Sequence, residues 1–444
     1  MAFPLRGYSP RLDYYGKSSC SGGIYCSMNT KLLDPCRIIA AILVIAIHTS
    51  PLESFSETGD FLLTRCIART AVPFFFMLTG YFLMPPRPRE GLRACQAQST
   101  QGSTHLGRPG RRALLYKNFV CREKKLFLIY FAAILLYLPL NIYSGQWDLS
   151  HPVKWLFFDG TFYHLWYLPA AILGLALVFL LTWSCFLRRW SARRASWLCL
   201  VLSLILYIPG LLGDSYYGCI QNIPALKAVY DFLFGISSYT RNGLFFAPVF
   251  ISLGWFIRNH PPRIRRRRQT FYGIASLALL SGLIMEALAL RSLLWQRHDS
   301  MYILLPPLMY FLFRFLLCLS QWAENRTNRP LPESPGHPVP FAPAKRYRGM
   351  RPSRHVCPKR CPQQNKGHSF YSNIALIIYI IHPWVIVLVR GFAKLSGLEP
   401  LLVHQSFIFF FAVTFVSCIL SVILWKIKRY SLITAFTRKF IKRR

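Results

Sequence analysis

Long apolar segments alternate with shorter polar ones along most of the chain. A membrane-spanning helix needs about 20 mostly apolar residues. Several of these segments contain proline, which membrane helices tolerate where neighbouring groups satisfy the freed backbone. The pattern predicts an all-α, polytopic membrane helical bundle of about ten transmembrane helices, at 36–55, 67–84, 125–144, 165–187, 196–213, 243–258, 270–290, 301–320, 371–390 and 405–426.

Basic residues are concentrated in alternate connections between these segments. Arginine and lysine crowd the stretches 85–125, 188–194, 258–268, 325–366 and 426–444. The other connections hold most of the scattered acidic residues and much less basic charge. Because cytoplasmic loops of membrane proteins carry an excess of Lys and Arg, this distribution places both termini in the cytoplasm.

The overall positive charge does not alter the prediction of a membrane protein. The 444 residues are 53% hydrophobic and 16% charged, with a formal net charge of +37. In a soluble protein, such an excess indicates binding to nucleic acid or to an anionic surface. Here the positive charge lies between apolar segments, so we expect the lipid bilayer, and no nucleic acid, as a partner.

Three stretches differ in composition from the apolar segments. Residues 1–30 form a polar extension without the apolar core of a signal peptide. The stretches 85–112 and 324–368 are rich in Pro, Arg and Gly, and we expect disorder there because they have few apolar residues to bury. The transmembrane domain is expected over 31–426, followed by a basic cytoplasmic tail over 427–444.

A weak metal-site pattern occurs in the second of these stretches. Cys357 and Cys361 lie near His355, as in half of a zinc site. No second pair with ligand spacing follows, so we interpret them as loop residues and expect no metal.

Arg37 and His48 lie eleven residues apart in the first apolar segment. In a helix, eleven residues make almost three whole turns, so both side chains lie on one face, roughly 16 Å apart along the axis. One interpretation is that Arg37 extends to the cytoplasmic interface while His48 caps the outer helix end. The other is functional, with His48 as a general base and Arg37 as the anchor for an anion or an oriented dipole.

Other ionisable residues stand at the ends of later apolar segments or within them. Each has a structural alternative, either in the aromatic belt at a membrane interface or in a proline kink. Arg122 and Lys125, before the third segment, form either a positive-inside anchor or a docking site for the phosphates of a cytoplasmic cofactor. The remaining candidates are Arg69, His164, Arg241 and His382.

Most of these residues fall in motifs that resemble the acyltransferase-3 family of integral membrane acyltransferases, and Arg69 lies just before one of them. Arg37 and His48 match its first-helix motif, an arginine, ten residues and a histidine. Arg122 with Lys125 resembles its Arg-x-x-Arg element, with lysine at the second position. The second-helix motif, the His-Leu-Trp-Tyr-Leu element and the late Tyr-x-x-His-Pro element are matched in order at 72–81, 164–168 and 379–383.

Within the family, residues 237–246 resemble the membrane half of the VanT-type serine racemases of vancomycin-resistant bacteria. Those proteins carry a soluble racemase that depends on pyridoxal phosphate (PLP) after the membrane domain. The chain stops at Arg444 without such a half, so we expect no PLP and no racemase activity. A separate racemase or an envelope-biosynthesis protein is then a candidate partner.

The resemblance implies transfer of an acyl group, most often acetyl from acetyl-CoA, to a hydroxyl of a small molecule or a cell-envelope glycan. It places the protein in the bacterial cell membrane. His48 would serve as base or acyl-relay residue, and Arg37 would orient the acyl donor. Arg122 and Lys125 would bind cofactor phosphates. The acceptor pocket would be lined by Arg69, His164, Arg241 and His382.

Two alternatives stay open. A cavity lined by His48, His382 and Arg241 would also suit a carrier that moves a zwitterion such as L-serine without covalent chemistry. The other alternative is a homologue that has lost activity. Serine accumulation in vesicles without acetyl-CoA would favour the carrier.

Overall fold

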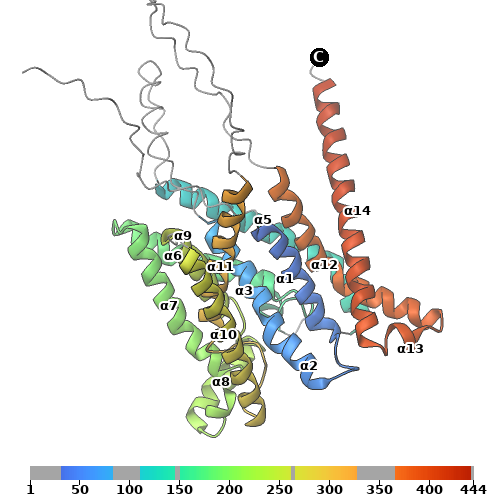
Figure 1. Ribbon diagram of the computed structural model, residues 1–444, viewed down its shortest axis with the longest axis horizontal. Helices are drawn as coiled ribbons and strands as arrows, with labels where there is room; N and C mark the ends of the chain where they lie inside the picture. Colours follow the sequence, from blue (N-terminus) through green and yellow to red (C-terminus); the bar gives the residue numbers. More distant parts are fainter. Residues whose placement is uncertain (1–31, 84–110, 146–150, 262–265, 328–365, 442–444) are drawn as a thin grey trace, which may run out of the picture. The chain divides into compact units, whose positions relative to one another are not determined.

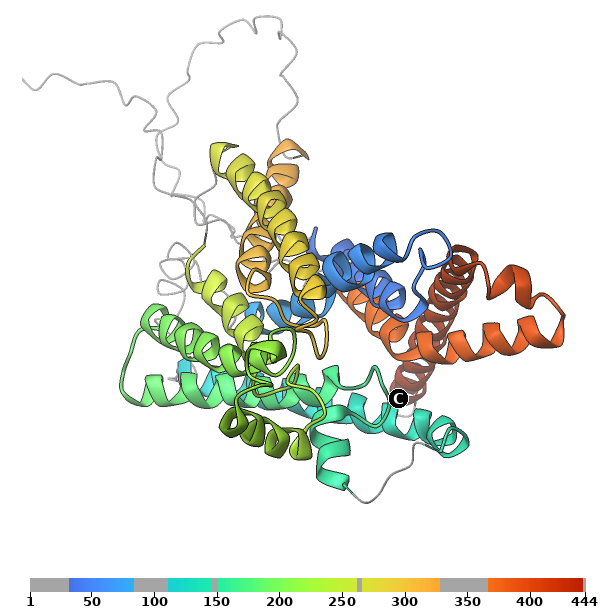
Figure 2. The ribbon, with the colours of Figure 1, turned by 90° about the horizontal axis from the view of Figure 1, so that it is seen from below.

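The computed structural model describes residues 32–83, 111–145, 151–261, 266–327 and 366–441. All of them belong to one compact unit, residues 29–86 and 104–444. The described residues form helices and turns and contain no strand, as the sequence predicts. Figures 1 and 2 show this helical chain from two directions. The helices are α1 (Leu33–Thr49), α2 (Glu57–Phe61), α3 (Ala71–Tyr81), α5 (Arg111–Tyr143), α6 (Tyr167–Leu187), α7 (Ala192–Leu212), α8 (Pro224–Ile236), α9 (Ala247–Asn259), α10 (Arg266–Ser292), α11 (Leu305–Thr327), α12 (Lys366–Leu395), α13 (Glu399–Leu402) and α14 (Ser406–Ile441).

Every predicted apolar segment overlaps a helix. Seven stretches within the described residues are long and apolar enough to cross a membrane. They lie at 57–81, 112–143, 167–187, 192–212, 267–292, 370–395 and 406–428. The other three predicted segments correspond to α1, α9 and α11. The fold is therefore that of a helical membrane protein, while the count of ten spans and the cytoplasmic termini stay predictions.

Large apolar side chains remain exposed on several of these helices. On α5, Leu128 is 68% exposed and Phe131 is 60% exposed, and on α14 Phe415 is 68% exposed. In water such a surface would be a liability, whereas lipid tails cover it favourably. The exposed apolar faces are consistent with a lipid environment.

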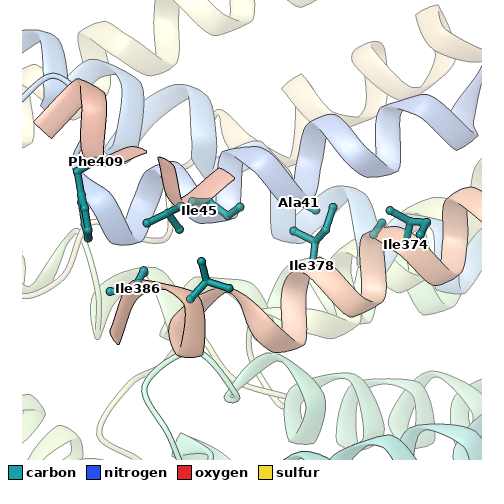
Figure 3. Packing of buried hydrophobic residues seen from close by; sticks show 9 residues of the cluster. Ala41, Ile45, Ile374, Ile378, Ile386 and Phe409 are labelled. Atoms are coloured by element: carbon teal, nitrogen blue, oxygen red, sulfur yellow. The ribbon is translucent and has the colours of Figure 1, made fainter. Parts of the chain in front are cut away.

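The buried core includes a layer between α1, α12 and α14. Ala41 and Ile45 from α1 lie opposite Ile378 from α12, and Phe409 from α14 closes one end of the layer (Figure 3). This packing fixes α1 beside α12, which places their two histidines next to each other.

Two glycines permit the close approach of α3 and α9. A Cβ atom at Gly80 would overlap the carbonyl oxygen of Ile251, and one at Gly254 would overlap that of Met77. Small residues at a helix interface let two backbones approach in this way.

Several helices extend beyond the predicted apolar segments. The predicted disordered stretches 85–112 and 324–368 fall mostly outside the described residues, as does the extension 1–30. Helix α5 already begins at Arg111, α11 continues to Thr327, and α12 begins at Lys366. Likewise, α14 continues through most of the predicted tail, because the apolar-basic sequence there has no helix-breaking residue.

Candidate active site

A cavity of about 580 Å³, with polar and apolar groups in its wall, lies at the C-terminal end of α1. Its walls also include the π-helix η1 (Leu62–Ile67) and the 3-10 helix η2 (Ala68–Thr70) between α2 and α3, the connection before α6, the connection before α9, and α12. A volume of this size suits a small molecule. Its charged, imidazole and phenol side chains are His48, Arg65, Arg69, Asp159, Tyr163, His164, Tyr167, Tyr239, Arg241 and Tyr379.

His48 reaches this cavity because α1 ends directly after it. Ser50 adopts a left-handed conformation with φ 44°, and Pro51 cannot continue the helix. The His48 ring stacks on His382, with ring centroids 5.4 Å apart, and meets the edge of Tyr163 at 4.9 Å. The imidazole is thus held between aromatic neighbours at the cavity wall.

His382 is oriented by the proline that follows it. Pro383 has no N–H, so the carbonyl oxygen of Tyr379, four residues earlier, loses its helical donor. The Nδ1 atom of His382 lies 2.8 Å from this oxygen and donates to it, which leaves Nε2 as an acceptor. That Nε2 atom is buried and has no hydrogen-bond partner among the described residues. His382 does not line the cavity but supports His48 from behind.

His164 is almost fully buried beside these groups. Its ring centroid lies 5.2 Å from that of His382 and 4.8 Å from that of Tyr137. The Tyr379 hydroxyl donates to the His164 carbonyl oxygen at 2.5 Å, and the Tyr137 hydroxyl donates to that of Ile380 at 2.6 Å. Burial, with the neighbouring histidines, lowers the pKa of His164 well below its ordinary value, so this imidazole is neutral at neutral pH.

Arg241 is held in one orientation. Its guanidinium lies over Tyr239, 4.1 Å from the ring centroid, and beside Trp166 at 5.2 Å. One nitrogen, Nη1, donates to the Ser300 hydroxyl at 2.8 Å. Aromatic faces and a hydroxyl fix the side chain, and no carboxylate of the described residues forms an ion pair with it.

Asp214 organises the segment behind Arg241. Its Oδ1 atom accepts the backbone N–H groups of Ser300 and Met301 at 2.7 and 2.9 Å, and the Ser215 hydroxyl at 3.0 Å. The side chain is fully buried. Burial raises the pKa of Asp214 to about 6, although the hydrogen bonds from Ser300 and Met301 act in the opposite direction. This carboxylate therefore fixes Ser300, which in turn binds Arg241.

Two further arginines and one aspartate complete the wall. Arg65 lies 3.8 Å from Asp299, a loose ion pair. Arg69, one helical turn later, has a buried Nε atom without a partner among the described residues. Asp159 accepts the Ser238 backbone N–H at 2.9 Å, which ties together the connections that precede α6 and α9.

A second basic cluster lies at the other end of α1, away from the cavity. Arg37 forms an ion pair with Asp34 at 2.7 Å. Arg122 donates to the carbonyl oxygen of Phe82 at 2.5 Å, at the C-terminal end of α3. Lys125 is exposed and lies within electrostatic reach of both arginines. Among the described residues, Lys125 has no ion-pair partner, whereas Arg37 and Arg122 already have protein partners.

The structure thus divides the predicted site residues into two groups. The first surrounds one cavity and consists of His48, Arg69, His164 and Arg241, with His382 in contact with His48. The second consists of Arg37, Arg122 and Lys125. Their predicted roles stay predictions, because the arrangement shows proximity and not chemistry.

Several residues at the site were missed by the sequence analysis. Arg65 is four residues before Arg69, the spacing of neighbours on one helical face, which was the available signal. Asp159 and Asp214 carried no such signal, since each contributes through contacts between distant connections. Tyr239 lies two residues before Arg241 and contacts it within one connection.

The described residues contain no group of three or more His, Cys, Asp or Glu side chains that could hold a metal ion. His355, Cys357 and Cys361 lie outside the described residues.

The fold and the cavity define a multi-pass helical membrane protein with a polar site inside the bundle. The acyltransferase domain model of the acyltransferase-3 family matches residues 31–337. The chain belongs to this family, as its motifs predicted. His382 and the rest of α12 lie beyond the matched residues.

The chain is also similar to three enterococcal proteins. Two from Enterococcus faecalis are named amino-acid racemase. One is 42% identical over 290 residues, which cover 64% of this chain and 35% of that protein. The other is 32% identical over 406 residues, which cover 89% of this chain and 46% of that protein. A serine/alanine racemase from Enterococcus gallinarum is 35% identical over 304 residues, covering 68% and 38%. The chain therefore spans less than half the length of these relatives. No solved structure matches it.

Proposed function

We propose that this family member transfers an acetyl group from acetyl-CoA to a hydroxyl group of a small molecule or an envelope glycan. The observation that carries the proposal is the position of His48 in a small-molecule-sized cavity, at one end of a helix whose other end carries a basic cluster. One end would bind the acceptor and the other the phosphates of the donor.

At the cavity, His48 acts as general base. Its imidazole takes the proton of the acceptor hydroxyl as the oxygen forms a bond to the acyl carbon. The carbon–sulfur bond breaks, and the proton leaves with the thiol. The stacked ring of His382 restricts the orientation of His48, and the neutral His164 completes the aromatic wall. A role for His48 as an acyl-relay residue uses the same position.

At the basic cluster, Lys125 fits a phosphate-binding role because its side chain is exposed. Lys428 of α14 adds a second exposed cation within electrostatic reach of Lys125. Arg122 fits less directly, since its guanidinium already binds a carbonyl oxygen at the end of α3. In the proposal, Arg37 and Arg122 shape the cluster and contribute charge, and the lysines contact phosphate.

The membrane setting is part of the proposal. We place the protein in the bacterial cell membrane with ten spans and both termini in the cytoplasm. The basic cluster then faces the cytoplasm, where acetyl-CoA is made, and the cavity opens on the outer side. A separate racemase or envelope-biosynthesis protein remains the candidate partner.

Purified protein in nanodiscs, supplied with acetyl-CoA labelled in the acetyl group, tests the proposal. The expected result is release of CoA with transfer of the label to a hydroxyl acceptor or to water. A folded, monodisperse protein that neither binds nor turns over acetyl-CoA would contradict it.

An amino-acid carrier is the second candidate, favoured by the racemase names of the three relatives. A racemase consumes an amino acid, and a membrane domain on the same chain could import that amino acid for it. Uptake of radiolabelled L-serine into proteoliposomes without acetyl-CoA would favour this candidate. Uptake no greater than in protein-free vesicles would count against it.

A further inference from the structure

The charge at the cavity wall is strongly unbalanced. Among the described residues that line the cavity, there are three guanidinium groups, those of Arg65, Arg69 and Arg241, and one carboxylate, that of Asp159. We infer that the cavity recognises its ligand through an anionic group, a carboxylate or a phosphate, bound between Arg69 and Arg241. The inference rests on the proposed function only in taking this cavity as the acceptor site.

The carboxylates near the wall leave these two arginines available. Asp299 lies beside Arg65, at 3.8 Å. Asp159 accepts the backbone N–H of Ser238 and lies in no ion pair with an arginine among the described residues. Asp214 is fully buried outside the cavity lining and binds backbone N–H groups. The charge of Asp214 acts on both Arg69 and Arg241, but none of these three carboxylates forms an ion pair with either arginine.

Arg241 has the geometry of a prepared anion site. The faces of Tyr239 and Trp166 and the Ser300 hydroxyl hold the guanidinium in place before any ligand arrives. A guanidinium carries five N–H donors in a planar fork that matches a carboxylate or phosphate. The hydroxyl of Ser300 uses one nitrogen, so other donors remain for an anion. Little side-chain entropy is lost on binding, because the group is already ordered.

Arg69 supplies the second charge. It lies at the cavity wall, and the positive charges of Arg65 and Arg241 act on it. Like charges that share a cavity of low dielectric repel one another, and arginine cannot relieve this repulsion by losing its proton. An anion between Arg69 and Arg241 removes the repulsion and gains two charge-assisted contacts. The same anion would leave the ligand's hydroxyl within the cavity that His48 shares.

Another role for the two arginines is stabilisation of the negative charge that develops during acyl transfer. That role predicts equal binding of anionic and neutral acceptors in the absence of the donor. Anion recognition predicts unequal binding in the ground state. Binding measured without acetyl-CoA therefore separates the two roles.

The experiment compares three small hydroxyl compounds, D-glycerate, glycerol 1-phosphate and glycerol, with the full chain purified in nanodiscs. Affinity is measured by calorimetry, without acetyl-CoA, for wild type, Arg69→Gln, Arg241→Gln and the control Arg188→Gln. Arg188 is an exposed arginine at the end of α6, outside the cavity lining. A charge-assisted contact corresponds to a change in affinity of about tenfold or more.

We expect at least one of the two anions to bind about tenfold or more tightly than glycerol, and each cavity variant to remove that preference. The control should keep it. Preference for glycerate indicates a carboxylate ligand, and preference for glycerol phosphate indicates a phosphate. Equal affinity of all three compounds for folded wild type, or an anion preference unchanged in both cavity variants, would overturn the inference.

The same preparations separate this inference from the proposed function. Turnover of acetyl-CoA without an anion preference would support the enzyme and reject the anion site. An anion preference in a protein that neither binds nor turns over acetyl-CoA would support the anion site and reject the enzyme.

Discussion

Because of the proline in α12, His382 donates a hydrogen bond to the backbone of its own helix, in addition to stacking on His48. Replacing His382 by leucine removes the Nδ1–H group that lies 2.8 Å from the carbonyl oxygen of Tyr379. Pro383 offers no N–H in its place, so this oxygen is left without a donor in a fully buried position. A buried acceptor without a partner lowers the free energy of unfolding by about 1–3 kcal/mol.

A second substitution should restore part of this loss. Pro383→Ala reintroduces a backbone N–H at the position from which a helix donates to Tyr379. In the double variant, the restored N–H takes the place of the lost imidazole donor. The expected coupling between the two substitutions is about 1 kcal/mol, with the double variant more stable than the sum of the single effects. His382→Asn is the matched control, because its amide nitrogen occupies nearly the position of Nδ1.

The assay is equilibrium unfolding in mixed micelles, followed by tryptophan fluorescence while the fraction of SDS is raised. We expect His382→Leu to unfold at the lowest SDS fraction and His382→Asn to stay close to wild type. Strictly additive effects in the double variant would refute this account of the kink. So would equal destabilisation by leucine and asparagine.

Three other predictions follow from single contacts. Gly80→Ala should prevent stable assembly, because the added Cβ overlaps the Ile251 carbonyl oxygen, whereas Gly391→Ala, with open space around it, should leave the size-exclusion profile unchanged. Lys125→Ala should weaken binding of acetyl-CoA without lowering the unfolding midpoint, whereas Arg122→Ala should lower both, because it also removes the contact with α3. Burial and nearby arginines lower the pKa of His298 to about 4, from 6.5, so its contribution to stability is present above pH 6.5 and is lost as the pH falls through about 4. His298→Gln should flatten that part of the stability profile relative to wild type, and identical profiles would reject the assignment.

The sequence was sufficient for the helical membrane class and for most of the helix positions. Hydrophobic segments of fixed length have few alternatives to a membrane helix, since backbone groups cannot stay unpaired in lipid. The boundaries of α14 and α5 were less predictable, because basic residues that end an apolar segment do not end a helix.

The sequence analysis also identified four of the ionisable residues at the cavity wall. His48 and His164 were found because a histidine at the end of an apolar segment is unusual and because both lie in family motifs. Their convergence with Arg69 and Arg241 depends on helix packing that no local pattern encodes. The sequence indicated that Arg37 lies away from the cavity only through its distance from His48 along α1.

The supporting contacts were not predictable from the sequence. Asp214 acts through backbone groups more than 80 residues further along the chain, at Ser300 and Met301. The role of His382 toward Tyr379 follows from helix geometry once Pro383 is placed inside a helix. Its contact with His48 needs the α1–α12 packing as well.

The most direct test of the central claim compares wild type with His48→Ala in acetyl transfer from labelled acetyl-CoA. His404→Ala is the matched control, since His404 is an exposed histidine outside the cavity lining. The account predicts that His48→Ala loses about a hundredfold or more of the wild-type rate, while the control and the unfolding midpoints stay unchanged. Full turnover in folded His48→Ala would contradict the assignment of His48 as the reacting base.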